Sequence, residues 1–138
     1  MKYVAIRENH LYQKAYKIGK RFVGKAVAVY VLKDYAAKRL QKEHPQKITV
    51  NRLGLSVSKK IGGAVERNRA KRVIRAAYGT VCHELKTGFL IVISARGAIE
   101  GKKSPQVAEE LVSAFTQLGL LPRSAEERTN KKENKQTI

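Results

Sequence analysis

The chain has 138 residues, of which 29 are lysine or arginine and only 11 are aspartate or glutamate, so its formal net charge is +18. A chain of this length builds one hydrophobic core, and so positive a balance favours nucleic acid or an anionic membrane surface as its partner. No apolar run reaches the roughly 18 residues of a membrane span, no hydrophobic signal segment opens the sequence, and Cys82 is the only cysteine; we therefore expect no membrane association and a cytoplasmic location.

A first helix is predicted between Asn9, a favourable N-cap, and Gly19, a residue that can end a helix in the left-handed conformation. Tyr12 and Tyr16 lie four residues apart, on a stripe beside the apolar one. The pair is open to two interpretations: rings packed at the edge of the core, or a platform on which a ligand stacks. The residues expected to face the core are Leu11, Ala15 and Ile18.

Strand structure is predicted from Phe22 to Leu32, with Gly24 as a bulge or bend that divides the stretch in two. Both faces are apolar, so we expect a central strand that is buried on one face and lines a groove on the other. One face carries Val23, Val27, Val29 and Val31, and the other carries Ala26, Ala28, Tyr30 and Leu32.

The next segment, Asp34–Lys47, is charged and ends near Pro45, which indicates a long basic connection between antiparallel strands. A strand is predicted for Ile48–Lys59, with Leu53, Leu55 and Val57 alternating toward the core. The opposite face carries Arg52, Gly54, Ser56 and Ser58. Small side chains make that face flat, so either a backbone or a base approaches it closely, or it is a plain solvent-facing surface.

A basic amphipathic helix is predicted from Ala64 to about Lys86, after a turn at Gly62-Gly63. At 100° per residue its apolar side chains occupy one arc and its basic side chains another. Only Glu66 interrupts the positive run, whereas an ordinary solvated helix face alternates the signs of its charges. We therefore expect a polyanionic partner. The basic arc contains Arg67, Asn68, Arg69, Lys71, Arg72 and Arg75, and Lys59 and Lys60 precede it.

The C-terminal part begins with the apolar run Phe89–Ile93, which indicates a strand covered on both faces. Ser104 as N-cap and Pro105 at the first position predict a last helix. Residues 123–138 have no aromatic residue and no apolar period, so we expect a disordered charged tail after a domain of residues 1–122. The core stripe of the last helix is Val107, Leu111, Ala114, Phe115 and Leu118.

The predicted element order is α-β-β-β-α-β-α. This order places the chain in the α+β class, as a single-domain sandwich of one mainly antiparallel sheet with helices packed on it.

No set of residues has the arrangement of a nuclease active site, which needs paired carboxylates for metal ions or a histidine acid and base. Asp34 is the only aspartate, and Glu109 and Glu110 are helix neighbours that diverge by 100°. Cys82 and His83 have no partner at ligand spacing. We therefore predict no catalytic residue, no metal site, no bound cofactor and no small-molecule substrate for the chain itself.

One long string carries a family resemblance. Gly54-Leu55-Ser56-Val57-Ser58-Lys59-Lys60-Ile61-Gly62, followed by Ala64-Val65 and Arg67-Asn68-Arg69-Ala70-Lys71-Arg72, closely resembles the bacterial ribonuclease P protein subunit, and a weaker resemblance extends from about Glu8 to Leu118. One departure is Gly63, where the family usually has an asparagine linked to contacts with the 5′ leader of the substrate.

The resemblance implies an unusual left-handed β-α-β crossover and a place in the endoribonuclease that removes the 5′ leader from precursor tRNA. It implies that the RNA subunit performs the hydrolysis, with the required Mg²⁺ held largely by RNA, and that the protein supports substrate binding. The implied partners are therefore the ribonuclease P catalytic RNA and precursor tRNA.

Two sets of contacts follow from the resemblance together with the residue patterns. Contacts with the catalytic RNA are expected from Lys59, Lys60, Arg67, Asn68, Arg69, Lys71, Arg72 and Arg75. The single-stranded leader is expected in a groove lined by Tyr12, Tyr16, Tyr30, Ser56 and Ser58.

Two other classes of protein share the size and charge. A structural RNA-binding protein, such as a ribosomal protein, fits the composition but not the Ser-Lys-Lys-Ile-Gly string. A helix-turn-helix regulator requires a second helix shortly before the basic one, which this sequence does not offer.

Overall fold

The computed structural model describes residues 4–6, 8–34 and 51–121. Most of the expected basic connection, residues 35–47, and the expected tail, residues 123–138, lie outside the described residues. Their conformations stay predictions, as does the division of the chain at residue 122.

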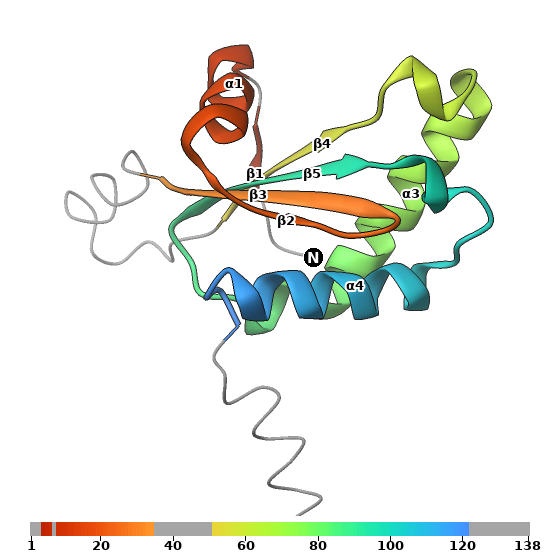
Figure 1. Ribbon diagram of the computed structural model, residues 1–138. Helices are drawn as coiled ribbons and strands as arrows, with labels where there is room; N and C mark the ends of the chain where they lie inside the picture. Colours follow the sequence, from red (N-terminus) through yellow and green to blue (C-terminus); the bar gives the residue numbers. More distant parts are fainter. Residues whose placement is uncertain (1–3, 7, 35–50, 122–138) are drawn as a thin grey trace, which may run out of the picture.

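The described elements confirm the α+β class and the order α-β-β-β-α-β-α (Figure 1). One short strand was not predicted, because its two residues carry no period. In chain order the elements are β1 (Val4–Ala5), α1 (Asn9–Ile18), β2 (Lys20–Val23), β3 (Val27–Lys33), β4 (Arg52–Ser56), η1 (Lys59–Ile61), α3 (Ala64–Val81), η2 (Cys82–Glu84), β5 (Phe89–Ala95), η3 (Gly97–Ile99) and α4 (Ser104–Gln117), where η marks a short 3-10 helix.

The strands form one mixed sheet in the order β1-β4-β5-β3-β2. Strand β3 pairs antiparallel with both β2 and β5, and its seven residues make the longest ladder, with β5. Strand β4 pairs parallel with both β1 and β5. The parallel pairing with β5 is possible because α3 carries the chain back across the sheet before β5 begins. The left-handed crossover implied by the resemblance concerns this β4-α3-β5 unit and stays a prediction.

Helices cover both faces of the sheet, with α1 on one side and α3 and α4 on the other (Figure 1). The larger core contains Val29, Ile91 and Ile93 and continues into α3 and α4. The smaller core contains Leu90 and Val92 together with Ala15 of α1. Strand β5 is therefore buried on both faces, as its continuous apolar run predicts.

Several element ends differ from the prediction. Asn9 and Ser104 are the first residues of α1 and α4 rather than their N-caps, a one-residue difference that is common at helix ends. Helix α3 ends at Val81, where η2 begins, and β4 ends at Ser56, before η1.

Gly19 does not adopt the left-handed conformation that the sequence suggested, since its φ is −71°. A Cβ at this position would lie 2.5 Å from the carbonyl oxygen of Ala15. Glycine is therefore required here by the close approach of two backbone segments, and this tight exit leads α1 directly into β2.

Two apolar residues differ from the predicted pattern: Ile18, expected to face the core, retains 59% of its surface, and Val23, placed on one face with Val27, retains 55%. Ile18 is the last residue of α1, so no further helical turn covers it. Strands β2 and β3 form a hairpin in which Val23 pairs with Ala28. Val23 therefore shares the face of Ala28 rather than that of Val27, which the sequence pattern had suggested.

The hairpin between β2 and β3 is held by two distant side chains. The carboxylate of Glu110, on α4, accepts hydrogen bonds from the backbone N–H groups of Ala26, at 3.0 and 3.2 Å, and Val27, at 3.2 Å. A Cβ at Gly24 would overlap this carboxylate. Arg96 Nη1 donates to the Gly24 carbonyl oxygen at 2.6 Å. These contacts fix the hairpin to α4 and to the segment after β5.

Candidate nucleic-acid interface

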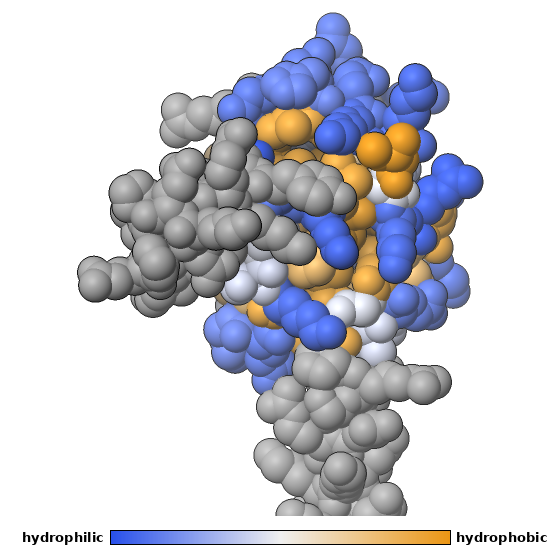
Figure 2. Space-filling view, turned by 90° about the vertical axis from the view of Figure 1, so that its left-hand side faces the viewer, coloured by the Kyte–Doolittle hydropathy of each residue, from blue (hydrophilic) through white to orange (hydrophobic). Residues whose placement is uncertain are grey.

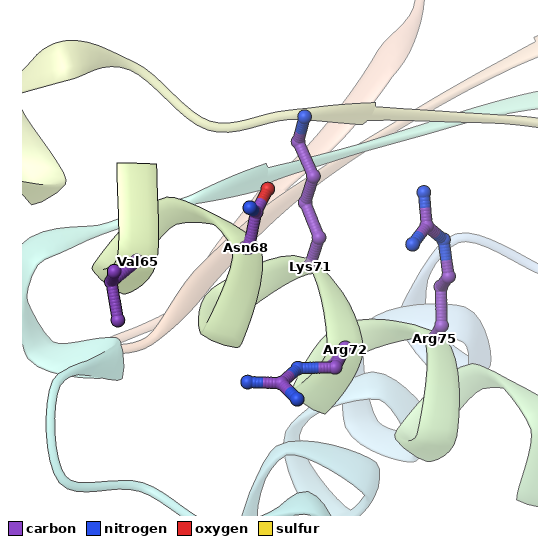
Figure 3. A pocket seen from close by; sticks show the side chains of 5 residues that line it. All are labelled: Val65, Asn68, Lys71, Arg72 and Arg75. Atoms are coloured by element: carbon purple, nitrogen blue, oxygen red, sulfur yellow. The ribbon is translucent and has the colours of Figure 1, made fainter. Parts of the chain in front are cut away.

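The basic residues of α3 surround a shallow open depression of about 460 Å³. Figure 3 shows Lys71 and Arg75 pointing to one side of the helix while Arg72 projects in a different direction. Arg72 and Arg75 are exposed, and Val65 beside them keeps 76% of its surface accessible. An open cationic depression of this kind suits phosphate groups, which require donors and positive charge more than depth. The lining residues are Val65, Asn68, Lys71, Arg72 and Arg75.

The other two arginines of the predicted arc lie apart from this depression. The guanidinium of Arg69 donates from Nη2 to the Lys102 carbonyl oxygen at 3.1 Å, on the side of α3 that faces the segment after β5. Arg67 Nε donates to the Gly63 carbonyl oxygen at 3.4 Å, along the start of the helix. The basic arc predicted from the sequence is therefore divided: Lys71, Arg72 and Arg75 line the depression, whereas Arg69 is attached to the segment after β5.

Lys59 and Lys60 are exposed in η1, between β4 and α3. They extend the positive surface beyond the first turn of the helix. Their neighbour Ile61 packs against the larger core, which fixes the position of this turn.

The opposite side of the sheet, under α1, is organised in rows of side chains set by the strand register. The row beneath α1 includes Gly54, Val92 and Tyr30 in adjacent strands. The next row runs through Ser56, Ser94, Ala28 and Val23, and in the described part of the chain none of these four belongs to the cluster beneath α1. The side chains of Ser56, Ser94 and Ala28 are small, so a flat strip borders α1, as the pattern in β4 predicted.

Tyr12 lies directly over Gly54, where an added Cβ would be 2.5 Å from its hydroxyl oxygen. The hydroxyl is 3.5 Å from the Ile6 carbonyl oxygen, and burial raises the pKa of Tyr12, with the nearby Tyr16 adding to the effect. The Tyr12 ring is therefore seated against the sheet, and only part of it remains accessible.

Tyr16 and Tyr30 contact each other edge to face, with ring centroids 4.8 Å apart and an interplanar angle of 87°. All three predicted tyrosines thus meet between α1 and the sheet, and each is half-buried. Half-buried rings both pack and present a face or edge to solvent, so the two interpretations of the tyrosines are compatible.

The serines that lie beside α1 differ from the prediction in two ways: Ser58 is not among them, and Ser94 is. Ser58 does not continue the row, because β4 ends at Ser56 and Ser58 is an exposed residue before η1. Ser94 joins the row from β5, opposite Ser56. Sequence reasoning missed Ser94 because only the register of β5 between β3 and β4 brings it there.

A partly buried ion pair lies at the start of β4. Arg52 donates from Nε to Asp34 Oδ2 at 2.6 Å and from Nη2 to Oδ1 at 2.9 Å, and Asp34 is 2% exposed. Glu8, which precedes α1, is 3.6 Å from Arg52 Nη1. The hydrogen bond with Asp34 raises the pKa of Arg52, and the charges of Asp34 and Glu8 contribute. Asp34, expected in a loop, thus joins β3 and β4 and links them to α1.

The surface is not hydrophilic throughout. Figure 2 shows the side of the molecule that lies at the left of Figure 1, where apolar side chains reach the surface between hydrophilic ones. Among the described residues, no group of three or more histidine, cysteine, aspartate or glutamate side chains is arranged to hold a metal ion. No helix within the described ranges is long and apolar enough to cross a membrane.

Three comparisons relate this chain to known proteins. A sequence model of the ribonuclease P family matches residues 1–119. The ribonuclease P protein component of Clostridium acetobutylicum is 36% identical over 121 residues, which cover 88% of this chain and 93% of that protein. The RNase P protein of Staphylococcus aureus matches with a TM-score of 0.69 at 27% identity, over 87% of this chain and 99% of that one. The RNase P protein of Thermotoga maritima, at 24% identity over 79% and 92% of the two chains, shares the fold with a TM-score of 0.62.

Proposed function

The chain belongs to the ribonuclease P protein family, and from this premise we propose that it binds both the catalytic RNA of ribonuclease P and the 5′ leader of precursor tRNA. As a ribonuclease P protein component it is part of a holoenzyme that processes tRNA. The observation that carries the proposal is the presence of two distinct surfaces. One is the cationic depression on α3. The other is the strip of small side chains beside α1 together with the half-buried Tyr12, Tyr16 and Tyr30 at its edge, which we call the tyrosine-lined strip.

The depression on α3 is the surface we assign to the catalytic RNA. Exposed Arg72 and Arg75 form no ion pair with any described residue, so their charges are available for phosphate groups. Each phosphate contact releases counterions from the RNA, which makes such binding strong at low salt. Lys59 and Lys60 extend the same surface.

The strip beside α1 is the surface we assign to the leader. A single-stranded RNA has exposed bases, which stack on aromatic rings such as Tyr16 and Tyr30. Its backbone then runs along small side chains, of which Ser56 and Ser94 offer hydroxyl groups. A duplex is wider and hides its bases, so this strip favours the single-stranded leader over the paired body of tRNA.

Hydrolysis of the leader is assigned to the RNA subunit, and the required Mg²⁺ to RNA ligands. Asp34, the one aspartate, is engaged with Arg52, and no group of three or more histidine, cysteine, aspartate or glutamate side chains among the described residues is arranged to hold a metal ion. The contribution of the protein is electrostatic and positional: its positive charge lies between two polyanions that otherwise repel each other. Such a role places it in the bacterial cytoplasm, with precursor tRNA.

Reconstitution tests the proposal. The purified chain is mixed with ribonuclease P RNA from the same organism and precursor tRNA at low magnesium concentration, and cleavage is followed on gels. We expect the chain to accelerate cleavage, and the double variant Arg72→Ala/Arg75→Ala to require a higher protein concentration for the same effect. Cleavage that is the same with and without the chain would refute the proposed function.

A further inference from the structure

A second cavity, of about 380 Å³, lies where α3 begins and the segment after β5 passes it. Strands β4 and β5 are parallel neighbours, so η1 and η3, which follow them, lie at the same end of the sheet (Figure 1). In open sheets with parallel strands, ligands commonly bind in the crevice beyond the carboxyl ends of the strands. The function proposed above makes no use of this cavity.

The walls of the cavity are apolar and firmly held. Ala70 and Ile99 are each 1% exposed and belong to the larger core, and Ile61 packs against that core. A volume of about 380 Å³ is in the range of small-ligand sites, which combine apolar walls with a few polar groups. Apolar walls of this kind suit the flat face of an unstacked base.

The polar groups of the cavity are Glu66 and Glu100, both exposed, and the half-buried Arg69. Neither glutamate forms an ion pair with another residue in the described ranges. Free carboxylates repel phosphate groups but accept hydrogen bonds from N–H groups on the edge of a base. Arg69 uses one N–H on the Lys102 carbonyl oxygen and has others for an acceptor on the ligand.

We propose that this cavity takes an unstacked guanine base of the RNA that binds α3, an inference that rests on the proposed function. Guanine carries its N1–H and N2–H donors side by side, so one carboxylate can accept both, and its O6 suits a guanidinium donor. Adenine, cytosine and uracil have no such pair of adjacent donors on that edge. Glu66 and Arg69 lie on the same helix as the cationic depression, so a base displaced from a bound strand would be within reach.

Replacing a cavity glutamate changes the affinity for RNA in opposite directions under this proposal and under electrostatics alone. Glu66→Gln and Glu100→Gln each make the chain more positive by one charge, so electrostatics alone predicts unchanged or tighter binding to ribonuclease P RNA. A guanine site predicts weaker binding by about five- to a hundredfold for at least one of them, because a bidentate contact is lost. Glu109→Gln, with the same charge change at an exposed residue of α4, is the matched control and should not weaken binding.

Dissociation constants are measured by filter binding at fixed salt, after circular dichroism has shown that the variants remain folded. A direct measurement accompanies them: NMR titration of the chain with guanosine 5′-monophosphate and, separately, adenosine 5′-monophosphate. We expect the guanine nucleotide alone to shift the amide signals of Ile61, Ile99 and Gly101.

Two outcomes overturn the inference: both cavity variants binding RNA at least as tightly as Glu109→Gln does, or equal shifts with the two nucleotides. In either case the proposed function stands if the unmodified chain binds ribonuclease P RNA. If the unmodified chain does not bind that RNA, the proposed function fails, and the nucleotide titration still decides whether the cavity selects guanine.

Discussion

At the scale of single residues, the tyrosine-lined strip depends on a missing side chain. Tyr12 reaches the sheet only because residue 54 is glycine, and its hydroxyl occupies the space where a Cβ would be. Tyr16 and Tyr30 then meet edge to face beside it. The flat face of β4, which the sequence suggested could accept a ligand, is thus partly covered by the ring of Tyr12.

Gly54→Ala should therefore displace Tyr12. Overpacking of this kind costs about 1–3 kcal/mol of unfolding free energy, measured by urea denaturation, and affinity for leader-bearing precursor tRNA should fall with it. Gly97→Ala is the matched control, since no atom lies within 4 Å of its added Cβ. A Gly54→Ala variant as stable as the control would show that Tyr12 does not lie on the sheet in solution.

Tyr16→Ala should weaken binding of precursor tRNA that carries a leader, by about five- to a hundredfold if one base stacks on the ring at roughly 1–3 kcal/mol. Mature tRNA, which has no leader, should bind almost as before. Tyr16→Phe keeps the ring and should leave the affinity for precursor tRNA nearly unchanged. Fluorescence anisotropy with the two tRNA forms distinguishes stacking from packing, because loss of packing would weaken both equally.

Tyr12→Phe should behave differently from Tyr16→Phe, since the Tyr12 hydroxyl lies near the Ile6 carbonyl oxygen and its pKa is raised by burial. Because the folded-state pKa lies above the ordinary value of about 10, the contribution of Tyr12 to stability is complete below pH 10 and is lost as the pH rises further. Unfolding free energies measured between pH 8 and 11 should fall less steeply for Tyr12→Phe. Parallel curves would contradict a buried hydroxyl.

At the scale of elements, the basic side chains of helix α3 lie in two different surroundings. Its cationic depression faces solvent, whereas Arg69 is attached to the segment after β5. Helical projection predicted the separation of basic and apolar arcs. It did not predict the attachment, because the neighbouring segment comes from another part of the chain.

Arg72→Ala and Arg75→Ala should each weaken binding to ribonuclease P RNA and reduce the slope of log Kd against log salt concentration by about 0.7–0.9 per lost phosphate contact. Neither should change stability, since both side chains are exposed. Arg69→Ala should in addition lower the unfolding free energy by about 0.5–1.5 kcal/mol, the net value of a hydrogen bond. Equal stability of all three variants would place Arg69 in solvent with the others.

The Asp34–Arg52 pair joins β3 to β4, which form no ladder with each other in the described residues. Asp34→Asn should reduce the unfolding free energy by about 1.5–3 kcal/mol, the range for a hydrogen bond to a charged group. It weakens both bonds to the Arg52 guanidinium, whose side chain is 22% exposed and keeps Glu8 as an acidic neighbour. Glu8→Gln is the comparison: its carboxylate is 49% exposed and lies 3.6 Å from Arg52, so solvent screening should hold its effect below about 1 kcal/mol. Similar losses for the two variants would contradict the burial of Asp34.

At the scale of the whole molecule, the sequence predicted the fold class, the element order and the two-sided burial of β5, because these follow from periodicity and apolar runs. Ser94, Glu110 and the Asp34–Arg52 pair could not be predicted in the same way. Each of them acts on a segment far away in the chain, and only the strand register and the docking of α4 bring those segments together.

We expect that no carboxylate of the chain takes part in the cleavage reaction of the ribonuclease P holoenzyme. Glu66→Gln, Glu84→Gln, Glu109→Gln and Glu110→Gln, made singly, should leave the single-turnover cleavage rate within about tenfold at saturating protein and magnesium, which is less than about 1.4 kcal/mol of barrier. Glu110→Gln serves as an internal check, since it should lower stability by loosening the hairpin. A loss of several orders of magnitude at any one position would assign chemistry to the protein.

Strand β5 has a consequence for biosynthesis. It is the only described strand that pairs with both β3 and β4, so it sets the position of Tyr30 relative to Ser56. Residues 89–95, which form β5, leave the ribosome after both of these residues. A nascent chain that has exposed the whole of α3 already carries its basic helix but cannot yet close the sheet. The strip beside α1 therefore forms only once residue 95 has emerged, late in translation. Until then the basic helix is the one proposed RNA-binding surface that a nascent chain can present.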